Sequence, residues 1–257
     1  MDILLYIAAG AGVGLIVGMT GIGGGALMTP LLLLFGFPPQ VAVGTDLMYA
    51  GITKAGGAWS HHRQNHVRWA LVKLLALGSI PSALLTGLLL EHLFKHPDNY
   101  AHLLRNALGI MLLLTAVVIL LRKQIQHWAS KASSRNWARW RPQATFIMGV
   151  FLGVFVTLSS VGAGAIGTAI LMLLYPALRS THIVGTDIAH AVPLTLCAGF
   201  IHMYLGNVDF ALLGALLIGS LPAIHVGSHL SRKMPDELLK PVLASLLLML
   251  GAKYAFF

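Results

Sequence analysis

Val43-Gly44-Thr45-Asp46 recurs 141 residues later as Val184-Gly185-Thr186-Asp187. This repetition is the strongest indication in the sequence of how the chain folds. His61 falls on His202 at the same offset, and a Gly-Ser-x-Pro string recurs in the same register. A fixed offset shared by several polar and glycine positions indicates an internal duplication. The chain is therefore predicted to contain two repeats and a linker, at residues 1–121, 143–257 and 122–142 respectively.

The composition predicts that both repeats lie in a membrane. Of the 257 residues, 57% are hydrophobic and only 10% are charged, whereas about a quarter of the residues in soluble domains are charged. Several runs with almost no charge approach the roughly 20 apolar residues that a helix needs to cross a bilayer. The first run, Ile3–Met19, has no basic leading region and no cleavage site, so we expect it to remain as a membrane segment. The expected fold class is an all-α polytopic membrane protein.

Each repeat is predicted to contain a glycine-broken helical hairpin followed by three transmembrane helices. The breaks fall at Thr20–Gly25 and at Ser160–Gly164. The run 26–37 spans about 18 Å as a helix, which is too short to cross the bilayer, so it should begin inside the membrane. The expected segments are 3–19, 26–37, 42–60, 69–91 and 102–121, then 144–159, 165–175, 183–203, 209–230 and 238–256.

The basic residues predict the orientation of the repeats. The linker Arg122–Arg141 carries six basic residues and no acid, and short basic loops favour the cytoplasmic side. If each broken pair returns as a hairpin, 13 basic residues lie on the cytoplasmic side and 3 lie outside. The repeats are then inverted, which is a recurrent transporter plan. A nucleic-acid arm would also explain the basic linker, but Trp128, Trp137 and Trp140 fit the headgroup layer better.

The breaks are the predicted substrate site. Irregular backbone at membrane depth persists only where it lines protein or a wet cavity, and the free N–H groups at a helix start favour an anion. Tight packing of helices through small residues is the alternative explanation. With the hydroxyls and the cation near the breaks, the predicted substrate-binding residues are Thr20, Gly21, Gly23, Gly24, Gly25, Thr45, Lys54, Ser159, Ser160, Gly162, Gly164 and Thr186.

Ionisable residues inside the apolar segments form a second group of candidates. Asp46 and Asp187 either cap the N-termini of their helices or hold a coupling proton. Lys54 either meets an anion or snorkels to the cytoplasmic end of its helix. His190 lies one turn from Asp187, and it either shuttles protons or is a hydrogen-bonded core histidine.

Other classes of function have weaker support in the sequence. The histidines of His61–His66 have no acid or cysteine beside them, and we predict neither a metal site nor a cofactor. No phosphate-binding string of the P-loop type is present, so the chain is not expected to hydrolyse ATP. An intramembrane hydrolase would need Ser159 or Ser160 together with His190 or His202. A passive anion channel remains an alternative to a carrier.

Several motifs of the two repeats resemble those of the sulfite exporter TauE/SafE family, also called the toluene sulfonate uptake permease family. The likeness covers essentially the whole chain. The matching pieces are Gly21-Ile22-Gly23-Gly24-Gly25, Pro30, Val43-Gly44-Thr45-Asp46, Lys54, His61, Arg63, Gln64, Gly185-Thr186-Asp187, His202 and Gly206-Asn207-Val208-Asp209.

This resemblance implies a secondary transporter of small sulfur-containing anions, such as sulfite or sulfonates, in the bacterial inner membrane. Export, uptake and proton coupling are all among the roles that it suggests, with a small anion and lipid as the partners and no nucleic acid. The second repeat departs from the first, because Leu171 stands in place of Pro30 and Ala165-Ile166 in place of Gly24-Gly25. The two hairpins are therefore not expected to contact substrate equally.

Overall fold

The computed structural model describes residues 3–20, 25–93, 100–131, 140–230 and 236–256, and every regular element in these ranges is an α-helix. The all-α prediction is therefore confirmed. The helices are α1 (Ile3–Thr20), α2 (Gly25–Leu34), α3 (Pro39–Arg63), α4 (Trp69–Leu93), α5 (Ala101–Leu120), α6 (Arg122–Lys131), α7 (Arg141–Ser159), α8 (Ala165–Leu174), α9 (Ser180–Tyr204), α10 (Phe210–Leu230) and α11 (Asp236–Phe256).

Five of the helices in the described ranges are long and apolar enough to cross a membrane: α4, α5, α7, α9 and α10. The helices α2 and α8 have ten residues each, so each spans about 15 Å, half of a hydrocarbon core. They follow α1 and α7 as the short second members of the predicted broken hairpins.

The Gly-Thr-Asp strings lie inside their helices. Helix α3 begins at Pro39, and proline is favoured at the first helical position because its missing N–H has no partner there anyway. Asp46 is therefore two turns into α3, and Asp187 is equally deep in α9, which begins at Ser180. The capping interpretation of these aspartates is wrong, because they lie about two turns into their helices, beyond the first-turn amides that a cap would bond.

The linker contains a helix that the sequence analysis did not predict. Helix α6 starts at Arg122, and only Leu121, the C-cap of α5, separates the two helices. Helix α6 packs against α8 of the second repeat. Trp137, one of the three predicted interfacial tryptophans, lies outside the described residues. Trp128 and Trp140 are exposed, as a headgroup position requires.

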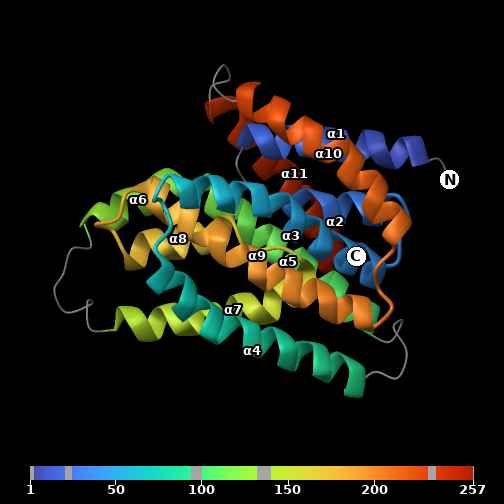
Figure 1. Ribbon diagram of the computed structural model, residues 1–257, viewed down its shortest axis with the longest axis horizontal. Helices are drawn as coiled ribbons and strands as arrows, with labels where there is room; N and C mark the ends of the chain where they lie inside the picture. The colour runs from blue at the N-terminus through green and yellow to red at the C-terminus, as the bar shows by residue number, and fades with distance from the viewer. Residues whose placement is uncertain (1–2, 21–24, 94–99, 132–139, 231–235, 257) are drawn as a thin grey trace.

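Equivalent helices of the two repeats pack in equivalent ways. Helix α1 packs along α10, and its counterpart α7 packs along α4. The remaining large contacts join α3 to α9 and α5 to α11. In Figure 1, α1 and α10 form the upper layer, α4 and α7 form the lower layer, and α3, α5 and α9 lie between them. Every one of these contacts crosses from one repeat to the other, so the repeats share their core.

Glycines let the paired helices approach to backbone contact. Gly14 of α1 faces the carbonyl of Ser220 on α10, and Gly153 of α7 faces the carbonyl of Ser79 on α4. A Cβ at either glycine would overlap the opposite backbone. Small residues are favoured at such interfaces because close packing drives helix association in lipid.

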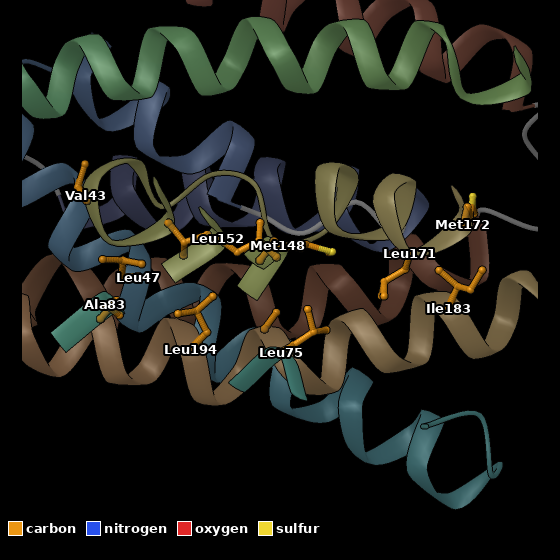
Figure 2. Close-up of a cluster of buried hydrophobic side chains, with 14 residues drawn as sticks. Val43, Leu47, Leu75, Ala83, Met148, Leu152, Leu171, Met172, Ile183 and Leu194 are labelled. Atoms are coloured by element: carbon orange, nitrogen blue, oxygen red, sulfur yellow. The ribbon is translucent and has the colours of Figure 1, made fainter. Parts of the chain in front are cut away.

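The largest buried apolar cluster lies between the lower and middle layers. Figure 2 shows Leu75 of α4, Leu152 of α7 and Leu194 of α9 close to one another, with Leu171 of α8 beside them. Leu75, Leu152 and Leu194 have no exposed surface, and Leu171 is 1% exposed. This cluster fixes α8, the short helix of the second hairpin, against α9.

The linker helix lies apart from the described ends of the two terminal helices. In Figure 1, α1 begins at the right and α11 ends right of centre, whereas α6 lies at the left. The linker helix and the two terminal helix ends thus lie toward opposite ends of the bundle. The placement of the linker on the cytoplasmic side stays a prediction from the count of basic residues.

Candidate functional site

A cavity of about 250 Å³ lies among α3, α8 and α9 and extends to α5 and α6. Most of its lining is apolar, including Ile119 and Met172. A small number of polar side chains in a largely apolar pocket is typical of small-molecule sites. The polar and charged side chains that line it are Thr53, Lys54, Arg122, Thr168 and Asp187.

Lys54 joins the two repeats at this cavity. It belongs to α3 of the first repeat, is 9% exposed, and donates from Nζ to the carbonyl of Ala163 at 3.3 Å. Ala163 lies in the break of the second repeat. The nine residues from Lys54 to the end of α3 at Arg63 span about 14 Å. That distance is long for snorkelling, and the ammonium group is instead directed at the broken backbone.

Asp187 lines the same cavity from α9. It is fully buried, and its Oδ1 lies so close to Gly167 of α8 that a Cβ at that glycine would overlap it. Neither carboxylate oxygen has a hydrogen-bond partner of good geometry among the described residues. Lys54 and the amide of Gly164 are close enough to interact with it electrostatically. An unpaired buried carboxylate is costly, so this arrangement suits a group that takes up and releases a proton.

The break between α7 and α8 has the strained geometry that its glycines predict. Gly162 has φ +121° and Gly164 has φ +128°, and Ser160 is left-handed at φ 58°. Residues that carry a side chain rarely adopt such positive φ values, whereas glycine adopts them without steric cost. The break brings the start of α8 to the cavity, where Gly164 and Ala165 line the wall. The positive end of the α8 dipole thus faces the space beside Lys54.

Two hydroxyls near the break, those of Ser159 and Thr168, are directed at backbone carbonyls. Ser159 Oγ donates to the carbonyl of Phe155 at 2.6 Å, and Thr168 Oγ1 donates to the carbonyl of Ala165 at 3.0 Å. Their protons are therefore used within their own helices. In this arrangement, Lys54 and the backbone amides are the better donors for an anion.

Asp46, the counterpart of Asp187, has a different environment. It is fully buried, does not line the cavity, and accepts a hydrogen bond from Thr29 of α2. Its Oδ1 has no partner among the described residues, although Ser160 lies close enough to interact with the carboxylate. The two aspartates are equivalent in sequence, but only Asp187 reaches the cavity.

The two threonines of the Gly-Thr-Asp strings hold the repeats together. Thr45 Oγ1 accepts from the amide of Asp209 at 3.1 Å, and Thr186 Oγ1 accepts from the amide of Arg68 at 3.0 Å. Asp209 and Arg68 are themselves equivalent positions at the offset of the repeat. Each threonine therefore fixes the turn after the third helix of the opposite repeat, and neither lines the cavity.

Buried histidines occupy packing positions next to the site. His190 has no exposed surface, and its Nε2 lies 2.8 Å from Ser79 Oγ on α4. His202 Nε2 lies 2.9 Å from the carbonyl of Thr157. Neither histidine hydrogen-bonds Ser159 or Ser160 within the part of the chain that the structure describes. In that part, no group of three or more His, Cys, Asp or Glu is placed to hold a metal ion.

A family model described as sulfite exporter TauE/SafE matches residues 6–254. The chain belongs to this family. The match covers both repeats, all the helices described above and the cavity between them. The protein is therefore a multi-pass membrane protein of a transporter family, in agreement with the predicted location in a bacterial cell membrane.

Three relatives of this TauE/SafE member are similar to it over nearly their full length. The probable membrane transporter protein YjnA of Bacillus subtilis is 42% identical over 255 residues, covering 96% of this chain and 97% of the relative. The probable membrane transporter protein YdhB of the same organism is 29% identical, covering 92% and 96%. The probable membrane transporter protein MJ0441 of Methanocaldococcus jannaschii is 26% identical, covering 96% and 93%. No solved structure matches this chain.

The cavity and the adjoining break contain part of the predicted substrate site. Lys54, Gly164 and Asp187 line one cavity, and Ser159, Ser160 and Gly162 belong to the adjoining break. Gly25 begins α2. Gly21, Gly23 and Gly24 lie outside the described residues, as does the side chain of Thr20, the last residue of α1. Besides Gly25 and the break residues Ser159, Ser160 and Gly162, the described predicted residues that do not line the cavity are Thr45, Asp46, Thr186 and His190.

Four further residues of this family member were not among the predicted site residues. Thr53 and Arg122 line the cavity, Thr29 bonds Asp46, and Ser79 bonds His190. The sequence could have pointed to Ser79, because its Gly-Ser-x-Pro string is repeated with the same offset as Gly-Thr-Asp. Nothing in the sequence distinguished Arg122 as a site residue, since a basic residue after a transmembrane helix is expected from the positive-inside rule alone.

Proposed function

We propose that this chain is a secondary carrier that moves small sulfur-containing anions across the cytoplasmic membrane by alternating access. The observation that carries the proposal is the cavity in which Lys54 of one repeat meets the helix start of the other, where Gly164 and Ala165 lie. A buried ammonium group and a positive helix end together suit an anion better than a neutral or cationic solute. The family description supports sulfite or a related oxyanion or sulfonate as the transported species.

The one-sided cavity supports a carrier over a passive channel. The cavity is lined by the later part of α3, from Thr53 to Gly57, and by the earlier part of α9, from Val184 to Ala191. Among the described residues, Asp46 and its neighbours in α3 from Val43 to Tyr49 do not line this cavity, and Asp46 accepts a hydrogen bond from Thr29. A channel would need a continuous path past both aspartates. A carrier built from two repeats needs one open half and one closed half, which exchange during transport.

Asp187 is the best candidate for a coupling proton. It lies within electrostatic range of Lys54, so the charge of Asp187 alters how strongly Lys54 attracts an anion. Lys54 also lies within electrostatic range of Asp46, which contributes less than Asp187. Protonation of Asp187 would therefore remove the stronger of the two acidic competitors with the substrate for Lys54. In this scheme proton and anion bind together, and the carrier moves them in the same direction.

Counterflow in proteoliposomes tests the carrier proposal. Vesicles that contain the purified protein are preloaded with unlabelled sulfite, a sulfonate, sulfate or thiosulfate, and labelled anion is then added outside. A carrier accumulates label transiently above its outside concentration, whereas a channel only equilibrates it. Label that never exceeds equilibrium would refute the carrier, and no flux of any of the four anions would refute the substrate class.

A further inference from the structure

Arg122 has a position that the positive-inside rule does not explain. Helix α5 ends at Leu120 and α6 begins at Arg122, so the chain turns sharply beside the cavity. Arg122 and Ile125, one turn apart on α6, both line the cavity. Ile125 is buried and α6 packs against α8, which keeps this face of α6 against the cavity. A linker that only retained charge in the cytoplasm would not need a fixed arginine in the cavity wall.

The guanidinium group of Arg122 is available to a ligand. Arg122 is only partly exposed, and it forms no hydrogen bond or ion pair within the described part of the chain. Its nearest cavity neighbours along the chain are the apolar Ile119 and Ile125. A charge beside an apolar wall is less screened than one in open water. An arginine without a protein partner in such a wall therefore attracts an anion more strongly than an ordinary surface arginine.

Two cations consequently lie along one cavity, at different depths. Lys54 is buried and directed at the break, whereas Arg122 lies on the linker helix and is partly open to solvent. The single acid that lines the cavity between the described helices, Asp187, interacts with Lys54. The cavity walls therefore offer a first contact at α6 and a deeper one at Lys54. An excess of positive over negative charge along a cleft raises the local concentration of an anionic ligand.

We propose that Arg122 is a second anion-binding residue, which receives the substrate at the α6 side of the cavity before the substrate reaches Lys54. This inference rests on the proposed function and adds a specificity residue to it. The guanidinium group is planar and presents paired donors, so it selects sulfonate, sulfite or carboxylate groups that accept two hydrogen bonds. Arg122 therefore sets the apparent affinity for anions that arrive from the α6 side, and it has no direct role for anions that arrive from the other side.

The test compares Arg122→Gln with Lys123→Gln. Lys123 is the next residue of α6, is exposed and does not line the cavity, so its variant loses the same charge from the same helix. Uptake of radiolabelled sulfite is measured in right-side-out and in inverted membrane vesicles, together with Lys54→Met. A charge-assisted hydrogen bond contributes about 1.5–3 kcal/mol, so Arg122→Gln should raise the half-saturation concentration at the α6 side roughly 10- to 150-fold. Lys123→Gln and the opposite side should change little.

The outcomes separate this inference from the proposed function. If Arg122→Gln behaves like Lys123→Gln while Lys54→Met loses transport, Arg122 contributes only general surface charge and the inference is overturned. If the wild type moves no sulfite and no other anion of the screen, the proposed function itself fails. Arg122→Lys covers the case in which glutamine disturbs α6, because lysine keeps the charge and loses the paired geometry. A partial loss in Arg122→Lys, with a normal melting temperature in detergent, supports the inference.

Discussion

Replacement of Lys54 by methionine tests the centre of the proposed site most directly. Methionine has a similar length and no charge, so it keeps the stem of the side chain within α3 and removes the ammonium group. Lys54 is 9% exposed, and its hydrogen bond in the described structure is to the carbonyl of Ala163 at 3.3 Å. The change therefore deletes the buried cation of the cavity and alters little of the surrounding packing.

The expected size of the effect follows from that geometry. A buried anion that pairs with Lys54 gains a charge-assisted hydrogen bond of about 1.5–3 kcal/mol. Its loss should weaken binding roughly 10- to 150-fold, and Lys54→Arg should retain part of the affinity because the charge remains. The melting temperature should also fall, because Lys54→Met leaves the buried carboxyl of Asp187 without its neighbouring cation.

Binding of labelled sulfite to purified protein, together with counterflow in proteoliposomes, measures the effect. Lys73→Met is the matched control, because Lys73 is an exposed lysine of α4 that does not line the cavity. If Lys54→Met binds and moves sulfite as the wild type does, the amides at the start of α8 suffice for the anion. The assignment of Lys54 to the substrate site would then be refuted.

Three further predictions concern coupling, packing and topology. Asp187→Asn should abolish flux driven by a proton gradient and spare part of the anion exchange; wild-type flux in a gradient would remove Asp187 from coupling. Gly153→Val should lower the free energy of unfolding by about 1–3 kcal/mol, because a Cβ overlaps the facing α4 backbone, whereas Gly214→Val meets open space and should melt near the wild type. Cysteines placed at Lys131 and Phe257 in a chain without Cys197 should label from opposite sides of the membrane, and labelling from one side would contradict the inverted orientation.

Buried polar side chains show where the two repeats are alike and where they differ. Two hydrogen bonds between the repeats form an equivalent pair, whereas the side chains that line the cavity have no such pairing. The hydrogen bonds of Thr45 and Thr186 are equivalent, because each threonine accepts from a backbone amide in the turn after the third helix of the opposite repeat. Lys54 breaks this symmetry, because the equivalent residue is Thr195, which bonds its own helix at Ala191. The buried cation at this position therefore has no basic counterpart in the second repeat.

Much of the fold could be read from the sequence. Apolar runs as long as a bilayer is thick can only be helices there, because no water satisfies the backbone, and the repeated Gly-Thr-Asp string revealed the duplication. The glycines at Gly162 and Gly164 predicted a break, since few other residues tolerate positive φ. Lys54 and Asp187 were also predicted as functional, because an ionisable group within an apolar segment is costly unless it has a use.

The tertiary structure decided which of these residues share one site. Asp46 and Asp187 are identical in sequence context, yet only Asp187 faces the cavity, because α8 and α2 approach them differently. Thr45 and Thr186 looked like caps or ligands, and their partners are turns of the opposite repeat. Arg122 looked like one basic linker residue among six, until α6 packed against α8 and placed it in the cavity wall. Local sequence specifies the helices and their polarity, whereas contacts between residues more than a hundred positions apart depend on how the helices pack, and no local pattern encodes that packing.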